Sequence, residues 1–288
     1  MKLIVVSSTE SLATEIIKQA LSHPRIISVV AIARHPIDIN TTRFESVVLQ
    51  NFEDWTPAGA AIYGSDACIW YVDIWWIRTF HYGAVARDNG HRRTVGVTPS
   101  ESLNTSPEEA RRICLDYTMA GMERMLEMWR EYSESPVFTS EYPFRFIYMS
   151  AANAERDRGK KPWVLGDLCL LKVRFSLSRS FEDSQMVVLI IHLQGETETR
   201  VLDFARGLDG IMKACVAKPG HIVPTAGNVL QGIKSGLSTI RAKLVGVPKI
   251  HVSEIAASLV ALAVHGCKVD TLSHEDLVTL GRELLGRT

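Results

Sequence analysis

Short apolar runs that alternate with helical stretches constrain the fold of this chain more than any other feature. The first run, "KLIVVS" at 2–7, is continuous, as expected for a parallel strand buried on both faces of a sheet. The next stretch has the spacing of an amphipathic helix, with apolar residues at Leu12, Ile16, Ile17 and Leu21. Further buried strands are predicted at 25–34, 46–50, 66–72 and 144–150, and within 210–220.

Helices are predicted between and after these strands. The longest covers 106–132, where Ser106 can cap the helix, Pro107 takes the first helical position and Glu109 completes a capping box. Two more are expected near the end of the chain, at 252–265 and 274–286. This alternation predicts an α/β fold with a doubly wound, mostly parallel sheet, in a single domain over residues 1–288.

Composition argues against several classes of protein. Of the 288 residues, 46% are hydrophobic, which is ample for a core. Lys and Arg together number 32, as do Asp and Glu, so no nucleic-acid partner is expected. The longest apolar run, at 186–193, is far shorter than the roughly 20 residues that span a bilayer, so no membrane association is predicted.

Cysteine and histidine spacing bears on redox state and metal binding. The nine histidines show neither HxH nor HExxH spacing, so no metal site is predicted. The cysteines are odd in number, lie far apart and form no CxxC pair, which predicts reduced thiols in a cytoplasmic protein. They are Cys68, Cys114, Cys169, Cys215 and Cys267.

Several segments, taken in order along the chain, resemble one protein family. They are "MKLIVV", "SHPRIISVVAIARHP", "GSDACIWYV", "EEARRICLDYT", "FRFIYMSAANAERD", "AKPGHIVP" and "IHVSEIAASLV". On these segments the chain is similar to the atypical short-chain dehydrogenases/reductases, in particular to a nucleoside-diphosphate-sugar epimerase-like branch common in fungi. The resemblance implies a Rossmann-type NAD(P)-binding fold and an NADP-dependent oxidoreductase that modifies a small-molecule substrate in secondary metabolism.

Two stretches, 73–95 and 173–194, show no clear period and fall where this architecture needs short loops. Leaving them out improves the match, because it brings Gly96 just after the fourth strand and joins Lys172 to the Gly-Glu pair at 195–196. The second stretch begins with Val and ends with Gln, which intron-border codons could encode. Two hypotheses stay open, unspliced introns and a genuine insertion on the substrate side, and sequencing of the transcript distinguishes them.

The turn after the first strand, "SSTESLA" at 7–13, lacks the glycines that let a dinucleotide approach the backbone. Ser7, Glu10 and Ala13 stand in the three glycine positions. The Glu10 carboxylate would lie at the helix N-terminus beside the pyrophosphate, and like charges about 4 Å apart repel by roughly 1 kcal/mol in water and about 4 near a protein surface. A weakened NADP site is therefore predicted here, formed by Ser7, Thr9, Glu10, Ser11 and Leu12.

Other positions match cofactor-binding residues of the family. The resemblance implies that Arg34, at the end of the second strand, contacts the 2′-phosphate of NADP, where an NAD-specific protein would have an acid. Asp66, at the start of the fourth strand, resembles the aspartate at the adenine edge. Pro219 and Gly220 resemble a Pro-Gly pair near the nicotinamide, although Pro-Gly after a strand is also ordinary turn chemistry.

The resemblance also implies a catalytic set of Tyr, Lys and Ser. Ser150, which ends the fifth strand, matches the Ser, and Lys172 matches the Lys. Leu168 stands where the Tyr belongs. Tyr148 is near, but we expect strand alternation to point it away from the face of Ser150. Cys114 replaces an Asn that is frequent in the family.

Three functions stay open at this point. The first is an NADP-dependent oxidoreductase with a weakened cofactor site. The second is a cofactor-independent isomerase or cyclase on the same scaffold, and the third is a non-catalytic pseudoenzyme. Binding of NADP separates the first from the other two, and turnover without nucleotide separates the second from the third.

Overall fold

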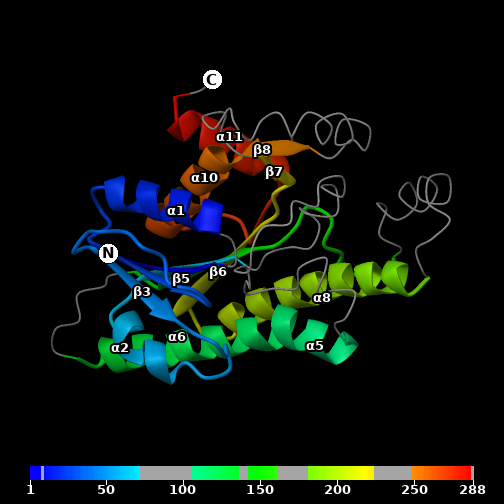
Figure 1. Cartoon of the computed structure of the whole chain (residues 1–288), viewed down its shortest axis with the longest axis horizontal. Helices are drawn as coiled ribbons and strands as arrows, with labels where there is room; N and C mark the ends of the chain where they lie inside the picture. Colours follow the sequence, from blue (N-terminus) through cyan, green and yellow to red (C-terminus); the bar gives the residue numbers. More distant parts are fainter. Residues whose placement is uncertain (8–9, 72–105, 136–141, 161–180, 224–247, 287–288) are drawn as a thin grey trace.

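A parallel sheet forms the centre of the molecule (Figure 1). The computed structural model describes residues 1–7, 10–71, 106–135, 142–160, 181–223 and 248–286. In these residues seven strands pair in the order β3-β2-β1-β4-β5-β6-β9, and every pair is parallel. The strands are β1 (Lys2–Ser7), β2 (Ser28–Ala33), β3 (Phe44–Val48), β4 (Ala67–Tyr71), β5 (Phe144–Met149), β6 (Met212–Ala217) and β9 (Thr271–Leu272).

The order of the strands reverses at β1, which pairs with β2 on one side and β4 on the other. Helix α1 (Glu10–Ser22) connects β1 to β2. Doubly wound sheets bind their ligands at such a reversal, outside the carboxyl ends of the strands. The predicted α/β class and the doubly wound, mostly parallel sheet are therefore confirmed.

Helices cover both faces of the sheet, which explains the continuous apolar runs. In β1 the side chains alternate, so Ile4 and Val6 join one buried cluster while Leu3 and Val5 join the other. One face carries α1, α10 (Val252–His265) and α11 (His274–Leu284). The opposite face carries α2 (Gly59–Ile62), α5 (Pro107–Arg111), α6 (Tyr117–Ser133) and α8 (Phe181–Arg206).

The predicted long helix at 106–132 is present with a wider turn inside it. The Ser106 hydroxyl accepts a hydrogen bond from the Glu109 N–H at 3.1 Å, as the predicted cap requires. Between α5 and α6 lies the π-helical turn η2 (Arg112–Asp116), which contains Cys114. The Cys114 carbonyl accepts hydrogen bonds from the Thr118 and Thr197 hydroxyls at 3.1 and 3.2 Å, so side chains satisfy this carbonyl within the widened turn.

Helix α8 was not predicted, and it corrects the expectation of a loop at its first half. Its residues 181–194 belong to the stretch that shows no clear period in the sequence. Ile190, Ile191 and Leu193 are buried, and Leu193 packs against Ala110 and Cys114. Residues 73–95 and 173–180 lie outside the described part of the chain, and the intron hypothesis stays a prediction.

Short elements complete the described structure. A separate two-stranded parallel sheet pairs β7 (His221–Val223) with β8 (Lys249–His251), and a 3₁₀ turn, η1 (Thr56–Ala58), precedes α2. Among the described residues, no helix combines the length and the apolar character that crossing a membrane requires.

Replacement of Gly121 by Ala should destabilise the fold. A Cβ at this position of α6 would lie 2.4 Å from Trp70 Cζ3, and Trp70 is fully buried among the rings of Phe52, Trp55 and Phe146. Because these rings leave Trp70 no room to move, we expect the free energy of unfolding to fall by about 1–3 kcal/mol in urea titrations. Gly207→Ala is the control: its Cβ would meet nothing closer than 3.6 Å, so a change within about 0.5 kcal/mol is expected.

Candidate functional site

The carboxyl ends of the strands lie in one row. Ser7 pairs in register with Tyr71, Tyr71 with Met149, Met149 with Ala217, and Ala217 with Leu272. These carboxyl ends therefore lie at the same edge of the sheet. This edge is where a doubly wound sheet binds its ligand.

The turns after β5 and β6 lie side by side at this edge. The Ser150 N–H donates to the Ala217 carbonyl at 2.8 Å, and the Ala152 N–H donates to the Pro219 carbonyl at 3.0 Å. A Cβ on Gly220 would lie 2.2 Å from the Pro248 carbonyl oxygen, so only glycine fits there. The fold thus brings Ser150 close to Pro219 and Gly220, and the roles that the resemblance implies for them stay predictions.

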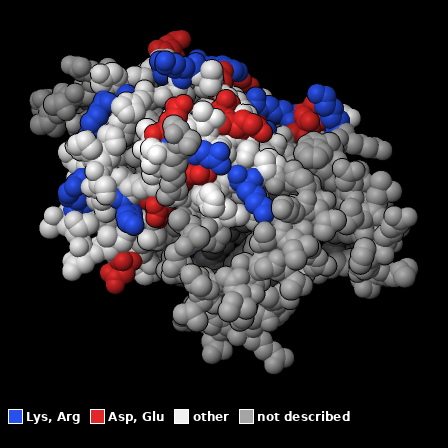
Figure 2. All heavy atoms as spheres, turned by 90° about the horizontal axis from the view of Figure 1, so that it is seen from above, with Lys and Arg blue, Asp and Glu red and all other residues white. Residues whose placement is uncertain are grey.

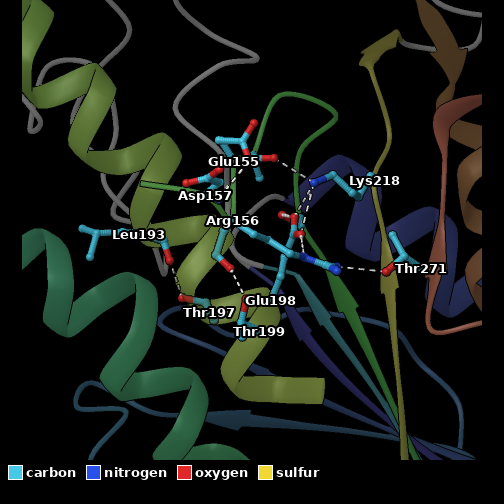
Figure 3. A network of polar contacts seen from close by, with 12 residues as sticks. Glu155, Arg156, Asp157, Leu193, Thr197, Glu198, Thr199, Lys218 and Thr271 are labelled. Carbon is cyan, nitrogen blue, oxygen red and sulfur yellow. Dashed lines mark hydrogen bonds and ion pairs between the residues drawn. The ribbon is translucent and has the colours of Figure 1, made fainter. Parts of the chain in front are cut away.

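A fully buried carboxylate, Glu198 of α8, is the centre of the polar contacts at this edge (Figure 3). Its Oε1 accepts a hydrogen bond from the Ser150 hydroxyl at 2.5 Å and lies 2.8 Å from Lys218 Nζ. Its Oε2 accepts from Arg156 Nε at 2.7 Å and from Lys218 Nζ at 3.1 Å. Two cations and a hydroxyl therefore compensate one buried negative charge.

The same cations continue the network to neighbouring segments. Lys218 Nζ also donates to the Ala154 carbonyl at 2.9 Å, and a terminal guanidinium nitrogen of Arg156 donates to the Thr271 hydroxyl at 2.9 Å. Figure 3 shows Arg156 and Lys218 approaching Glu198 from the loop after β5 and from the end of β6. The network thus ties α8 to the carboxyl ends of β5, β6 and β9.

Gly195 allows α8 to approach the loop after β5. A Cβ at Gly195 would lie 1.9 Å from the Glu155 carbonyl oxygen, a distance that no side chain tolerates. The Glu155 N–H donates in turn to the Ile191 carbonyl at 3.3 Å. In α8 the residue directly before Gly195 is Gln194. Lys172, which would precede Gly195 if residues 173–194 were left out, lies outside the described residues.

The position of Tyr148 corrects an expectation. Residues two apart in a strand share a face, and both Tyr148 and Ser150 contact α8, through Thr197 and Glu198 respectively. Tyr148 is fully buried, and burial is the main cause that raises the pKa of its phenol well above the usual value. It therefore shares the face of Ser150 but is poorly suited to exchange protons at pH 7.

Arg34 lies just beyond the carboxyl end of β2 and is half-buried. Its Nε is buried and, among the described residues, has no hydrogen-bond partner. A buried guanidinium N–H that no protein group satisfies is expected to bond water or a ligand. Arg34 thus leaves one buried donor that the described protein groups do not satisfy.

The described residues around the β1–α1 turn belong to the end of β1 and the start of α1. Glu10 and Ser11 are the first two residues of α1, and the Leu12 side chain is buried in the core. Ser7 ends β1 and is also buried. Glu10 thus stands at the N-terminus of the helix, as the sequence predicted.

Asp66 lies apart from the other candidates. It precedes β4 at the amino edge of the sheet, where its Oδ2 accepts a hydrogen bond from the Lys2 N–H at 2.7 Å. This contact joins β4 to β1 at the edge opposite the ligand-binding one. Thr9, Gly96 and Lys172 lie outside the described residues, so their predicted roles stay predictions.

Solved structures of short-chain dehydrogenases resemble this chain over most of its length. One from Leptospira borgpetersenii with bound NAD+ has a TM-score of 0.56 at 11% identity and covers 96% of this chain and 92% of its own. One from Burkholderia cenocepacia in complex with NADP has a TM-score of 0.53 at 12% identity, covering 94% and 86%. The RhlG/NADP complex of Pseudomonas aeruginosa has a TM-score of 0.53 at 11% identity, covering 96% of each chain.

The chain has a Rossmann fold of the short-chain dehydrogenase type. No protein-family model and no curated protein matches the sequence. Identities of 11–12% establish the fold and carry no substrate with them.

The surroundings of Ser150 in this fold do not suit the role that the resemblance implies, which is to polarise a substrate carbonyl. Its side chain is fully buried and its hydroxyl proton is donated to Glu198. Glu198 was not singled out from the sequence, because it is one of two similar acids in "GETETR". The sequence signal that could have indicated Glu198 was Gly195. This glycine lies against the loop after β5, and Glu198 lies one helical turn further along α8, near Ser150.

Removal of the Glu198 carboxylate should destabilise the protein. Glu198→Ala would leave Lys218 and Arg156 without their buried partner, which typically costs 3–5 kcal/mol. We expect about 3 kcal/mol in urea titrations, because the side chain of Arg156 is 39% exposed and can be rehydrated. Asp203→Ala removes an exposed carboxylate of the same helix and should change the free energy of unfolding by about 0–1 kcal/mol. Equal effects of the two substitutions would contradict the central place of Glu198.

The hydrogen bond between Gly220 and His274 should make the free energy of unfolding depend on pH. The Gly220 N–H donates to His274 Nδ1 at 2.9 Å, so the ring must be neutral at that nitrogen. Burial, the largest cause, lowers the pKa of His274 from 6.5; Glu275 and Glu254 oppose this effect and Arg282 adds to it. The unfolded chain takes up a proton near pH 6.5, so this stability is present above that pH and is lost as the pH falls below it.

The variant His274→Asn keeps a hydrogen-bond acceptor that does not titrate. Its free energy of unfolding should therefore fall less steeply than that of the wild type between pH 7 and 5. Identical slopes for the two proteins would contradict this role of His274.

Proposed function

We propose that this chain binds NADP at the carboxyl edge of β1 and β2 and acts as an oxidoreductase on a small molecule, with a weakened site. The observation that carries the proposal is the buried, unsatisfied Arg34 Nε at the end of β2. The fold supports a nicotinamide cofactor in general, because the similar solved structures hold NAD+ or NADP.

Arg34 favours NADP over NAD. A guanidinium presents a fork of N–H donors that matches a phosphate, and such charge-assisted bonds are stronger than neutral ones. Because Arg34 is half-buried, a phosphate bound to it would contribute in two ways. It would satisfy a donor that now lacks a hydrogen bond, and it would add a charge–charge contact. The ribose 2′-phosphate of NADP would supply that partner.

Glu10 opposes the pyrophosphate. It stands at the start of α1, where the free N–H groups of the helix would otherwise favour an anion. A carboxylate at this point repels the cofactor by roughly 1–4 kcal/mol, depending on the solvent exposure. The proposed site therefore binds NADP with an affinity lowered by about one to three decades.

Ser150 is the residue at which the proposed catalytic set is weakened. A bound nicotinamide would supply hydride transfer to or from a carbon atom of the substrate. Ser150 donates its proton to Glu198, so it is not free to polarise a carbonyl in this arrangement. Basic and acidic side chains are interspersed over the described part of the face in Figure 2, which is consistent with a small-molecule partner.

Calorimetric titration with NADPH and NADH tests the proposal. We expect NADPH to bind the wild type about 10–100-fold more tightly than NADH, because a charge-assisted hydrogen bond contributes about 1.5–3 kcal/mol. Arg34→Ala should abolish that difference by weakening NADPH alone. Glu10→Gln should strengthen binding of both nucleotides.

Arg130→Ala is the matched control. Arg130 is exposed in the last turn of α6, whose end contacts Tyr63 near the amino edge of the sheet. This variant should bind both nucleotides as the wild type does. No heat with either nucleotide at millimolar concentration, from a chain that is folded by circular dichroism, would overturn the proposal.

A further inference from the structure

A cavity of about 350 Å³ lies at the opposite edge of the sheet from the proposed cofactor site. Its walls come from the starts of β5 and β6, the end of α8 and the loop that joins α10 to β9. Two cysteines from different walls line it, Cys215 on β6 and Cys267 on the loop. Neither belongs to the cofactor site.

The two cysteines lie close together at this cavity. Cys267 packs against the buried cluster that contains Cys215. The neighbouring Cys267 side chain and burial both raise the pKa of the Cys215 thiol. Cys215 is 2% exposed, whereas Cys267 is partly exposed. One thiol of the pair is therefore accessible and the other is covered.

The backbone holds the two segments together. The Val216 N–H donates to the Asp270 carbonyl at 2.9 Å, and the Lys218 N–H donates to the Leu272 carbonyl at 3.0 Å. The first of these bonds lies one residue from Cys215 and three residues from Cys267. The parallel pairing of β6 with β9 thus holds the loop that carries Cys267 beside the strand that carries Cys215.

Positive charge surrounds the accessible thiol. The cavity is lined by Arg145, Arg206, Lys213 and Lys268, against one carboxylate, Asp270, which is paired with Arg206. Basic surroundings and partial exposure are the conditions that make a cysteine reactive. The other described cysteines lack them: Cys68 and Cys114 are buried, and burial raises the pKa of Cys114 to about 12.

We propose that Cys215 and Cys267 form a redox-active dithiol that hydrogen peroxide converts to an intramolecular disulfide between β6 and the α10–β9 loop. A partly exposed cysteine next to a second, resolving cysteine is the arrangement of peroxide-sensing thiols. The proposal is independent of the cofactor site and of any activity there.

The chemistry balances with hydrogen peroxide as the two-electron oxidant. The Cys267 sulfur, as a thiolate, attacks one peroxide oxygen; the O–O bond breaks, hydroxide leaves and takes up a proton as water, and Cys267 becomes a sulfenic acid. The Cys215 sulfur then attacks the Cys267 sulfur, the S–O bond breaks, and the proton of the Cys215 thiol leaves with the hydroxide as a second water. Both sulfurs are oxidised and a reducing thiol restores them.

The test is oxidation of the folded, reduced full-length chain with a small molar excess of hydrogen peroxide. Free thiols are alkylated under denaturing conditions and peptides are identified by mass spectrometry. The expected main product is a peptide pair joined through Cys215 and Cys267, which dithiothreitol removes, with Cys68 and Cys114 recovered in alkylated form. Because this result is read in the wild type, it does not depend on the folding of any variant.

Variants identify the role of each thiol. Cys267→Ser should lose the linked peptide, and Cys215→Ala should leave Cys267 as a sulfenic acid that dimedone traps. Cys169→Ser is the control and should still form the linked peptide. Wild-type Cys267 that proceeds to sulfinic acid without a linked peptide, a disulfide to a different cysteine, or complete recovery of both thiols as alkylated cysteine would overturn the proposal.

Discussion

The register of the parallel sheet is the constraint on which the candidate sites depend. The carboxyl ends of five strands lie at one edge, because Ser7, Tyr71, Met149, Ala217 and Leu272 pair in one row. A shift of one residue in any pair would turn each side chain of that strand to the other face. Helices on both faces prevent such a shift, since each strand must supply apolar side chains to two buried clusters at once.

Glu198 joins the elements that this register brings to the edge. A buried carboxylate is costly unless cations and hydrogen-bond donors compensate it, and here Ser150, Lys218 and Arg156 do so from three different segments. The same contacts that stabilise the edge use the Ser150 proton, so structural stability and carbonyl chemistry compete for one hydroxyl. This competition gives the proposed weakening of the site a physical reason that is separate from the absence of glycines in the β1–α1 turn.

Strand β6 carries different chemistry at its two ends. At its carboxyl end Lys218 contacts Glu198, and the following Gly220 is anchored to His274. Towards its amino end lies the cavity that Cys215 shares with Cys267. The strand pairs on both sides, so the proposed disulfide at Cys215 would fix the α10–β9 loop against the strand that leads to the proposed cofactor edge.

Local periodicity and capping were enough to predict the strands β1 to β6, the capped helix at Ser106 and the parallel, doubly wound class. The sequence also placed Ser150, Arg34, Pro219 and Gly220 at strand ends. It did not predict helix α8, because residues 181–194 show no clear helical period. Four features emerged only from the folded chain: Ser150 bonds to Glu198, Tyr148 shares the face of Ser150, Asp66 lies at the amino edge, and Cys215 lies near Cys267. Each of these contacts joins residues distant in the chain, or depends on which edge of the sheet a residue occupies, and no local pattern encodes either.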